Sequence, residues 1–238
     1  MDATGTPQEP GTPADGRPAA ERAGTAERVA DTLRARISEG AFPPGSRLSE
    51  EAVGGDLGVS RNTLREAFRL LVRERLLVHE LNRGVFVRVP TDADVEDIHR
   101  TRRLVESAAL RGLGRPPYPL EGLVDAVVDG ERAALNDDWP AVSTANIRFH
   151  LALVALAGSA RTDELMRGVL AELRLALHPV ADARALHEPY LAGNREILAA
   201  LGAGDRDAAE RLLDRYLDDS HAQVTAARAR HRPPSPAD

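Results

Sequence analysis

A turn of only three residues between two predicted helices constrains the fold of this chain more than any other feature. Ser49 precedes two glutamates, which is typical of a helix N-cap with carboxylates in the first turn, and this helix ends at Gly58. Ser60 then caps the next helix, so only Gly58, Val59 and Ser60 connect the two. A short connection that contains glycine indicates a helix-turn-helix.

The second of these helices, within VSRNTLREAFRLL, has two chemically different faces. Its apolar face carries Leu64, Ala67, Phe68 and Leu71, and its polar face carries Arg61, Arg65 and Arg69. The second helix of a helix-turn-helix lies in the DNA major groove, where its first residues reach the base edges. We therefore interpret the polar face as a DNA-contacting surface. The alternative for any single arginine is an ordinary solvated position.

A β-hairpin is predicted directly after this helix. In LLVHELNRGVFVRV, valines alternate with other residues on one side of Asn82-Arg83-Gly84, with the period of a half-buried strand. Arg83 lies at the tip of the hairpin, where it could enter the neighbouring minor groove. With a helix in ERVADTLRARISEG and a short extended piece after AFPPG, residues 25–90 are predicted to form a winged helix-turn-helix.

The predicted DNA contacts follow from position in this domain. The first turns of the second helix supply base contacts, its later residues and the segment before the first helix supply phosphate contacts, and the hairpin tip reaches the minor groove. The residues concerned are Arg47, Ser60, Arg61, Asn62, Thr63, Arg65, Arg69 and Arg83.

The rest of the chain is predicted to be entirely helical. Helices are expected over 92–113, 120–135, 140–157, 162–180, 187–202 and 205–229, and their short connections indicate an antiparallel bundle. The expected fold class is thus mainly α, a winged helix-turn-helix over 25–90 followed by a bundle over 91–226. Residues 1–24 and 227–238 are expected to be disordered tails because they have few large apolar side chains.

Composition and charge narrow the possible functions. The chain has no cysteine, which excludes disulfides and thiolate chemistry, and no apolar run long enough to cross a membrane. Residues 27–90 contain 11 Arg and 9 acidic residues, whereas residues 91–238 contain 18 and 24. The mildly basic N-terminal part and the acidic C-terminal part suggest two separate functions.

The sequence contains no HExxH motif and no nucleophile–base pattern, so we expect a cytoplasmic protein that is not an enzyme.

The stretch VSRNTLREA followed by NRGVFV resembles the signature of the GntR family of bacterial transcription factors. The resemblance implies that Arg61 and Arg65 read bases, that Asn62 and Thr63 support them, and that the wing glycine Gly84 approaches the minor groove. One departure is the sequence AVGGDL, whose two glycines are expected to weaken the first helix of the motif.

The segment TDADVEDIHRTRRLVESAAL resembles the start of the FCD effector domain, which marks the FadR subfamily. The resemblance implies a cavity in the bundle for small carboxylates, often with a divalent metal held by one Asp and three His. At those four positions this chain has Asn146, His150, Asn194 and Tyr216. Two amides and a phenol are poor ligands for such metals, so no metal cofactor is expected. Rescue of the site by His178 or His187 remains an alternative.

The same resemblance places Arg102 toward the cavity, where it could bind a ligand carboxylate with two hydrogen bonds. Alternatively Arg102 pairs with Glu106 on a solvated face, and His150 is a hydrogen-bonded core histidine.

We expect a homodimeric regulator, a repressor by family default, that binds a palindromic operator in double-stranded DNA. A small polar or carboxylate effector would bind Arg102, Asn146, His150, Asn194 and Tyr216. The alternative is a DNA-binding dimer whose bundle senses no small molecule.

Overall fold

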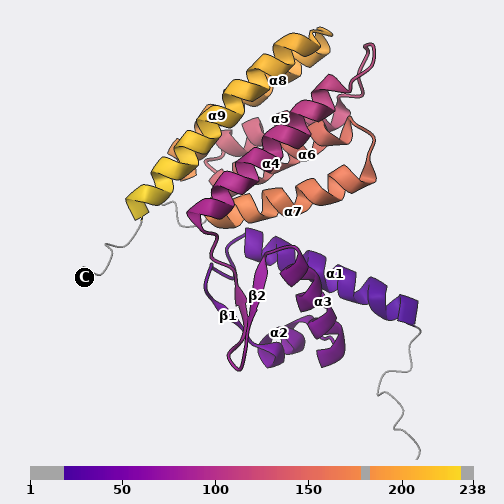
Figure 1. Ribbon diagram of the computed structural model, residues 1–238, viewed down its shortest axis with the longest axis vertical. Coiled ribbons are helices and arrows are strands. Elements are labelled where there is room, and N and C mark those ends of the chain that lie inside the picture. Colours follow the sequence, from indigo (N-terminus) through magenta and orange to yellow (C-terminus); the bar gives the residue numbers. More distant parts are fainter. Residues whose placement is uncertain (1–18, 178–182, 232–238) are drawn as a thin grey trace, which may run out of the picture.

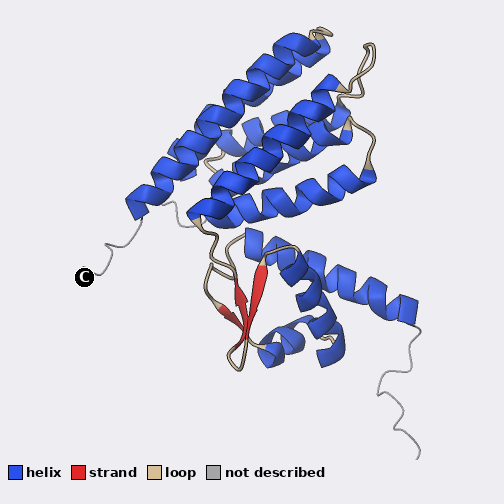
Figure 2. Ribbon diagram, in the orientation of Figure 1, coloured by secondary structure: helices blue, strands red, loops and turns tan. Residues whose placement is uncertain are grey.

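The computed structural model describes residues 19–177 and 183–231, which form a small mixed domain and a helical bundle (Figure 1). All of its strands lie in the small domain (Figure 2). The small domain consists of α1 (Ala19–Ser38), β1 (Arg47–Leu48), α2 (Glu50–Leu57), α3 (Arg61–Arg73), β2 (Leu77–Glu80) and β3 (Gly84–Val87). The bundle consists of α4 (Asp92–Arg111), α5 (Glu121–Leu135), α6 (Trp139–Ala155), α7 (Ala160–Leu177), α8 (Ala183–Gly202) and α9 (Arg206–His231). The predicted fold class is confirmed.

The small domain is held together by one apolar core beneath a short sheet. Strand β3 is central and pairs antiparallel with both β1 and β2, with Val78 of β2 opposite Phe86. The predicted apolar face of α3 is buried, and Leu64 and Leu71 pack with Leu33 of α1. Burying α3 on this side leaves its arginine face exposed.

The bundle consists of long helices joined by short connections. Helix α4 begins with a capping box, in which Thr91 and Asp94 each accept a hydrogen bond from the other's backbone N–H. The core of the bundle is mainly aliphatic, with few aromatic residues. Phe149, Leu153 and Ile197 are among its fully buried side chains. None of the described helices is long and apolar enough to cross a membrane.

Helix α7 joins the two domains, because it runs along the side of the bundle that faces α1 (Figure 1). Its residues Ala171 and Leu175 belong to the apolar core of the small domain. Polar contacts reinforce this junction: Arg88 bonds Glu172 of α7 at 2.9 Å and Asp94 of α4 at 2.6 Å. Burial raises the pKa of Glu172, whereas Arg88 opposes the shift.

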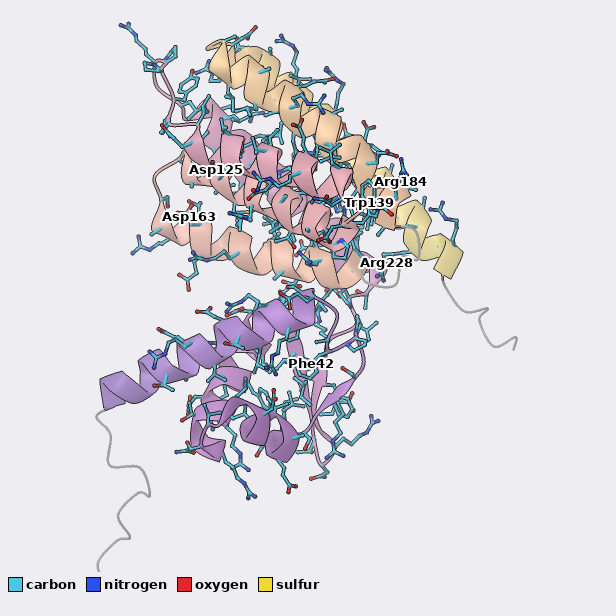
Figure 3. The ribbon with its side chains drawn as sticks, turned by 180° about the vertical axis from the view of Figure 1, so that it is seen from behind. Phe42, Asp125, Trp139, Asp163, Arg184 and Arg228 are labelled. Carbon is cyan, nitrogen blue, oxygen red and sulfur yellow. The ribbon has the colours of Figure 1, made fainter. Side chains whose placement is uncertain are left out.

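Arg228 of α9 contacts the connection between the two domains. Figure 3 shows it at the end of the bundle next to the small domain, and its guanidinium donates to the backbone oxygen of Pro90 at 2.7 Å. The connection between the domains is therefore held from α7 and from α9.

Several predicted boundaries differ from the observed ones. Helix α1 begins at Ala19, inside the segment predicted as a tail, and α9 continues to His231. Helix α8 begins at Ala183 rather than 187, with Pro189 inside it. Residues 1–18, 178–182 and 232–238 are outside the described part of the chain, and so is His178.

Candidate nucleic-acid interface and polar cavity

The turn before α3 fixes how this helix is presented. Gly58 has a left-handed backbone conformation (φ 62°), which glycine adopts without steric cost. Ser60 accepts a hydrogen bond from the backbone N–H of Thr63 at 3.2 Å and caps α3 as predicted. The helix therefore begins abruptly with Arg61 and Asn62, both exposed.

The structure places three of the predicted arginines on one exposed surface of α3, with different partners. Arg61 forms no ion pair with any described residue, whereas Arg65 donates to both carboxylate oxygens of Glu50 at 3.0 Å. Arg69 pairs with Glu66 of its own helix. Exposed ion pairs contribute only about 0–1 kcal/mol, so phosphate or base acceptors can replace these carboxylates at small cost. A groove of ≈ 600 Å³ is lined by Arg65 and Arg69 of α3 and by His79 and Val85 of the strands.

The wing carries the other predicted contacts. Arg83 lies at the tip of the hairpin, pairs with Glu80 and has its guanidinium 5.4 Å from the centre of the Phe86 ring. Gly84 has φ 111°, and a Cβ there would lie 3.2 Å from the Nε of Arg47. The Arg47 side chain therefore lies beside Gly84, where the absence of a Cβ gives it room.

Thr63 differs from its predicted neighbours because its side chain faces inward. It is only 9% exposed, and its hydroxyl lies 2.9 Å from that of Ser60. The structure therefore places Thr63 within the cap of α3, apart from the surface formed by Arg61, Asn62 and Arg65.

The bundle contains a buried charged network at the predicted effector site. Arg102 Nε donates to Glu106 at 2.8 Å, and His150 Nδ1 lies 2.7 Å from the other Glu106 oxygen. The Arg102–Glu106 pair considered in the sequence does form, but it is buried rather than solvated. Burial alone would raise the pKa of Glu106, but Arg102 and His150 together outweigh burial and lower the pKa to about 2. Burial lowers the pKa of His150.

A second set of hydrogen bonds joins the three residues that replace the family's metal ligands. Asn146 Oδ1 accepts from the Asn194 amide at 2.7 Å and from the Tyr216 hydroxyl at 2.8 Å. The Tyr216 ring also lies 4.8 Å from the ring of His150. All four predicted positions are therefore brought together by α6, α8 and α9.

This arrangement does not fit a divalent transition metal. Asn146 Oδ1 already accepts two hydrogen bonds, and burial raises the pKa of Tyr216, which keeps its phenol protonated. His150 is left without an anionic co-ligand from these positions, whereas zinc, nickel and manganese favour imidazole and carboxylate. Across residues 19–177 and 183–231, no three His, Asp or Glu side chains are placed to hold a metal ion.

A small cavity of ≈ 20 Å³ lies beside Arg102, Asn146 and His150, large enough for about one water molecule. Three buried polar atoms of its lining have no hydrogen-bond partner among residues 19–177 and 183–231: Arg102 Nη2, His150 Nε2 and His187 Nδ1. Burial, followed by the charge of Arg174, lowers the pKa of His187 to about 4. Such atoms need a partner, which either a water molecule or a ligand in this cavity can supply.

Arg174 also lines this cavity, although the sequence analysis did not single it out. The sequence offered little signal, because Glu172 and Arg174 are both charged residues in the otherwise apolar segment Val169–Leu177. The guanidinium of Arg184, near the start of α8, lies 5.6 Å from the centre of the ring of Trp139, the first residue of α6. Figure 3 labels both residues.

Comparison with known proteins divides the chain in the same way as the structure. Residues 25–87 match the model for bacterial regulatory proteins of the gntR family, and residues 97–219 match the FCD domain. A protein of Rhodococcus sp. RHA1, described as a transcriptional regulator GntR, is 46% identical and has a TM-score of 0.81, covering 86% of this chain and 99% of that one.

Two curated relatives are more distant. An Escherichia coli protein named for the regulation of an L-lactate dehydrogenase operon is 27% identical over 222 residues, covering 83% of this chain and 85% of its own. The gluconate operon transcriptional repressor of Bacillus licheniformis is 34% identical over 94 residues, covering 40% of this chain and 38% of its own.

Proposed function

Because the chain belongs to the GntR family of bacterial regulatory proteins and carries an FCD domain, we propose that it is a homodimeric, effector-controlled repressor. It binds a palindromic operator in the cytoplasm through α3 and the wing. A small polar or carboxylate effector in the bundle cavity releases it from DNA. The observation that carries this proposal is the exposed arginine face of α3 in a domain that shares its core with the cavity-bearing bundle.

The experiment starts with selection of DNA from a random pool by the purified full chain. We expect recovery of one short inverted repeat. Binding of that site is then measured with small sugars and carboxylates at increasing concentration, and an effector should weaken it. Failure to enrich any sequence would contradict the DNA-binding part. A recovered site whose affinity no ligand changes would favour a bundle that only dimerises.

We also propose that the effector binds without a metal, because Asn146, Asn194 and Tyr216 replace the anionic and imidazole ligands. Elemental analysis of the unaltered protein should find no stoichiometric zinc, nickel or manganese, and chelators should leave operator binding unchanged. The triple substitution Asn146→Asp, Asn194→His and Tyr216→His should create metal binding. About one equivalent of metal per unaltered chain would refute the proposal.

A further inference from the structure

We propose that Arg174 is the anion anchor of the bundle cavity, and that its contact with α1 transmits the binding of a small carboxylate to the DNA-binding domain. This inference rests on the proposed function and specifies the ligand class and the regulation of the same site. It follows from three observations: the charge balance of the cavity, its unpartnered atoms, and the position of Arg174 between the two domains.

The charges of the cavity lining do not cancel. The charge of Arg102 is neutralised by Glu106 at 2.8 Å, and burial keeps the pKa of His150 and of His187 low, so both rings are neutral near pH 7. Arg174 is partly buried and forms no ion pair with a described residue. Burial lowers its pKa, and the nearby charge of Glu39 opposes this shift. A partly buried guanidinium that forms no ion pair with a described residue can bind an anionic ligand at this cavity.

Within the described residues, the hydrogen bonds of Arg174 are all to neutral oxygens. It donates to the backbone oxygen of Ser38 at 2.7 Å, to the hydroxyl of Thr144 at 2.8 Å and to the backbone oxygen of Pro140 at 3.5 Å. A carboxylate is a stronger acceptor for a guanidinium than any of these, because both partners are then charged. The unpartnered Nη2 of Arg102 supplies a further donor in the same lining.

Ser38 is the last residue of α1, so its bond to Arg174 ties the cavity to the DNA-binding domain. The cavity of ≈ 20 Å³ is smaller than any carboxylic acid, and a ligand can enter only if lining groups move. A bound carboxylate draws the Arg174 guanidinium toward itself and away from Ser38. Helix α1 packs directly on α3, so this change reaches the DNA-contacting helix.

The test uses the full chain with glycolate, L-lactate and gluconate, and with the neutral amide of each acid as its matched control. Binding is measured by titration calorimetry, and operator affinity on the selected DNA site. We expect at least one acid to bind about tenfold or more tightly than its amide and to weaken operator binding. Hydrogen exchange of residues 35–41 should increase when that acid binds.

Arg174→Gln should reduce the affinity for the acid by about 10- to 100-fold and bring the acid-to-amide ratio close to one. Arg174→Lys keeps the charge without the planar fork, so it should bind the acid more weakly yet still prefer it to the amide. Arg167→Gln, at an exposed position of the same helix, should behave like the unaltered protein. Circular dichroism checks that each variant is folded.

The unaltered protein alone can overturn this inference. Binding of acids and amides with equal affinity, or of none of the acids, would refute the anion anchor whether or not Arg174→Gln folds. Unchanged acid affinity in a folded Arg174→Gln protein would do the same. If the chain binds its operator and responds to a neutral ligand, the proposed function stands and only the role of Arg174 fails. Absence of any DNA site would instead refute the proposed function.

Discussion

Arg61 and Arg65 lie one turn apart on α3, yet only Arg65 has a carboxylate partner among the described residues. Before contacting DNA, Arg65 has to leave Glu50, whereas Arg61 is already available. Because an exposed pair contributes little, this difference affects the approach to DNA more than the final affinity. Both arginines can form two hydrogen bonds with guanine once they are in the major groove.

We expect Arg61→Ala and Arg65→Ala each to weaken binding to the selected operator by about 1–3 kcal/mol, with a smaller loss on unrelated DNA. Fluorescence anisotropy with both DNAs measures the difference, and Arg132→Ala, on the exposed side of α5, is the control. The prediction is wrong if a folded Arg61→Ala protein retains full operator affinity.

The buried histidines predict how stability depends on pH. In the folded protein, burial and then the charge of Arg174 lower the pKa of His187 from its usual 6.5 to about 4. Between these two pH values the unfolded chain binds a proton at His187, whereas the folded protein does not. The free energy of unfolding should therefore decrease between pH 6.5 and 4. In His187→Gln this decrease should be smaller, although His99, whose pKa is also lowered to about 4, still contributes. Urea denaturation at several pH values measures the free energy of unfolding of both proteins. The same decrease with pH in the unaltered protein and in His187→Gln would contradict this prediction.

At the scale of single elements, local sequence signals predicted the helices and the hairpin well. Serine caps, left-handed glycines and apolar spacing act within a few residues, so they can be recognised without the fold. The early start of α1 at Ala19 was missed because AAERAG lacks a strong cap or apolar stripe.

The candidate sites were predictable to different degrees. The exposed arginines of α3 follow from its period alone. The bonds between Asn146, Asn194 and Tyr216 depend on the packing of three helices that are distant in sequence, and only the family resemblance pointed to these positions. The contact between Arg174 and Ser38 joins residues from different domains, so no local pattern could reveal it.

Helix α2 is a useful element for a stability test, because it contains two glycines in eight residues. A Cβ added to Gly55 would meet nothing within 4 Å, so Gly55→Ala should stabilise the protein by about 0.5–1 kcal/mol. Gly58→Ala, at a left-handed position, should destabilise it instead. Chemical denaturation of both variants measures these shifts, and a destabilising Gly55→Ala would show that α2 needs this glycine.

At the scale of the whole molecule, one chain presents a single α3 and a single wing to DNA. The bundle has exposed apolar side chains that a second copy could cover. Val124 and Val128 of α5, for example, are 43% and 45% exposed. A two-fold symmetric pair would place two copies of α3 on neighbouring half-sites.

We therefore predict a dimer in solution and a symmetric footprint on the operator, because operator symmetry mirrors protein symmetry. Light scattering at the concentrations used for DNA binding measures the mass, and hydroxyl-radical footprinting maps both half-sites. A monomer at these concentrations, or protection of one half-site only, would contradict this prediction.

The packing of α7 also has a consequence for how such proteins diversify. Ala171 and Leu175 follow the DNA-binding domain by many residues in the chain but complete its core in space. A recombination event that joined residues 19–90 to the bundle of a relative would replace two core side chains and both carboxylate partners of Arg88 at once. Exchange of sensor domains between regulators of this architecture is therefore constrained chiefly by the surface of α7, and to a smaller extent by the contacts from α4 and α9.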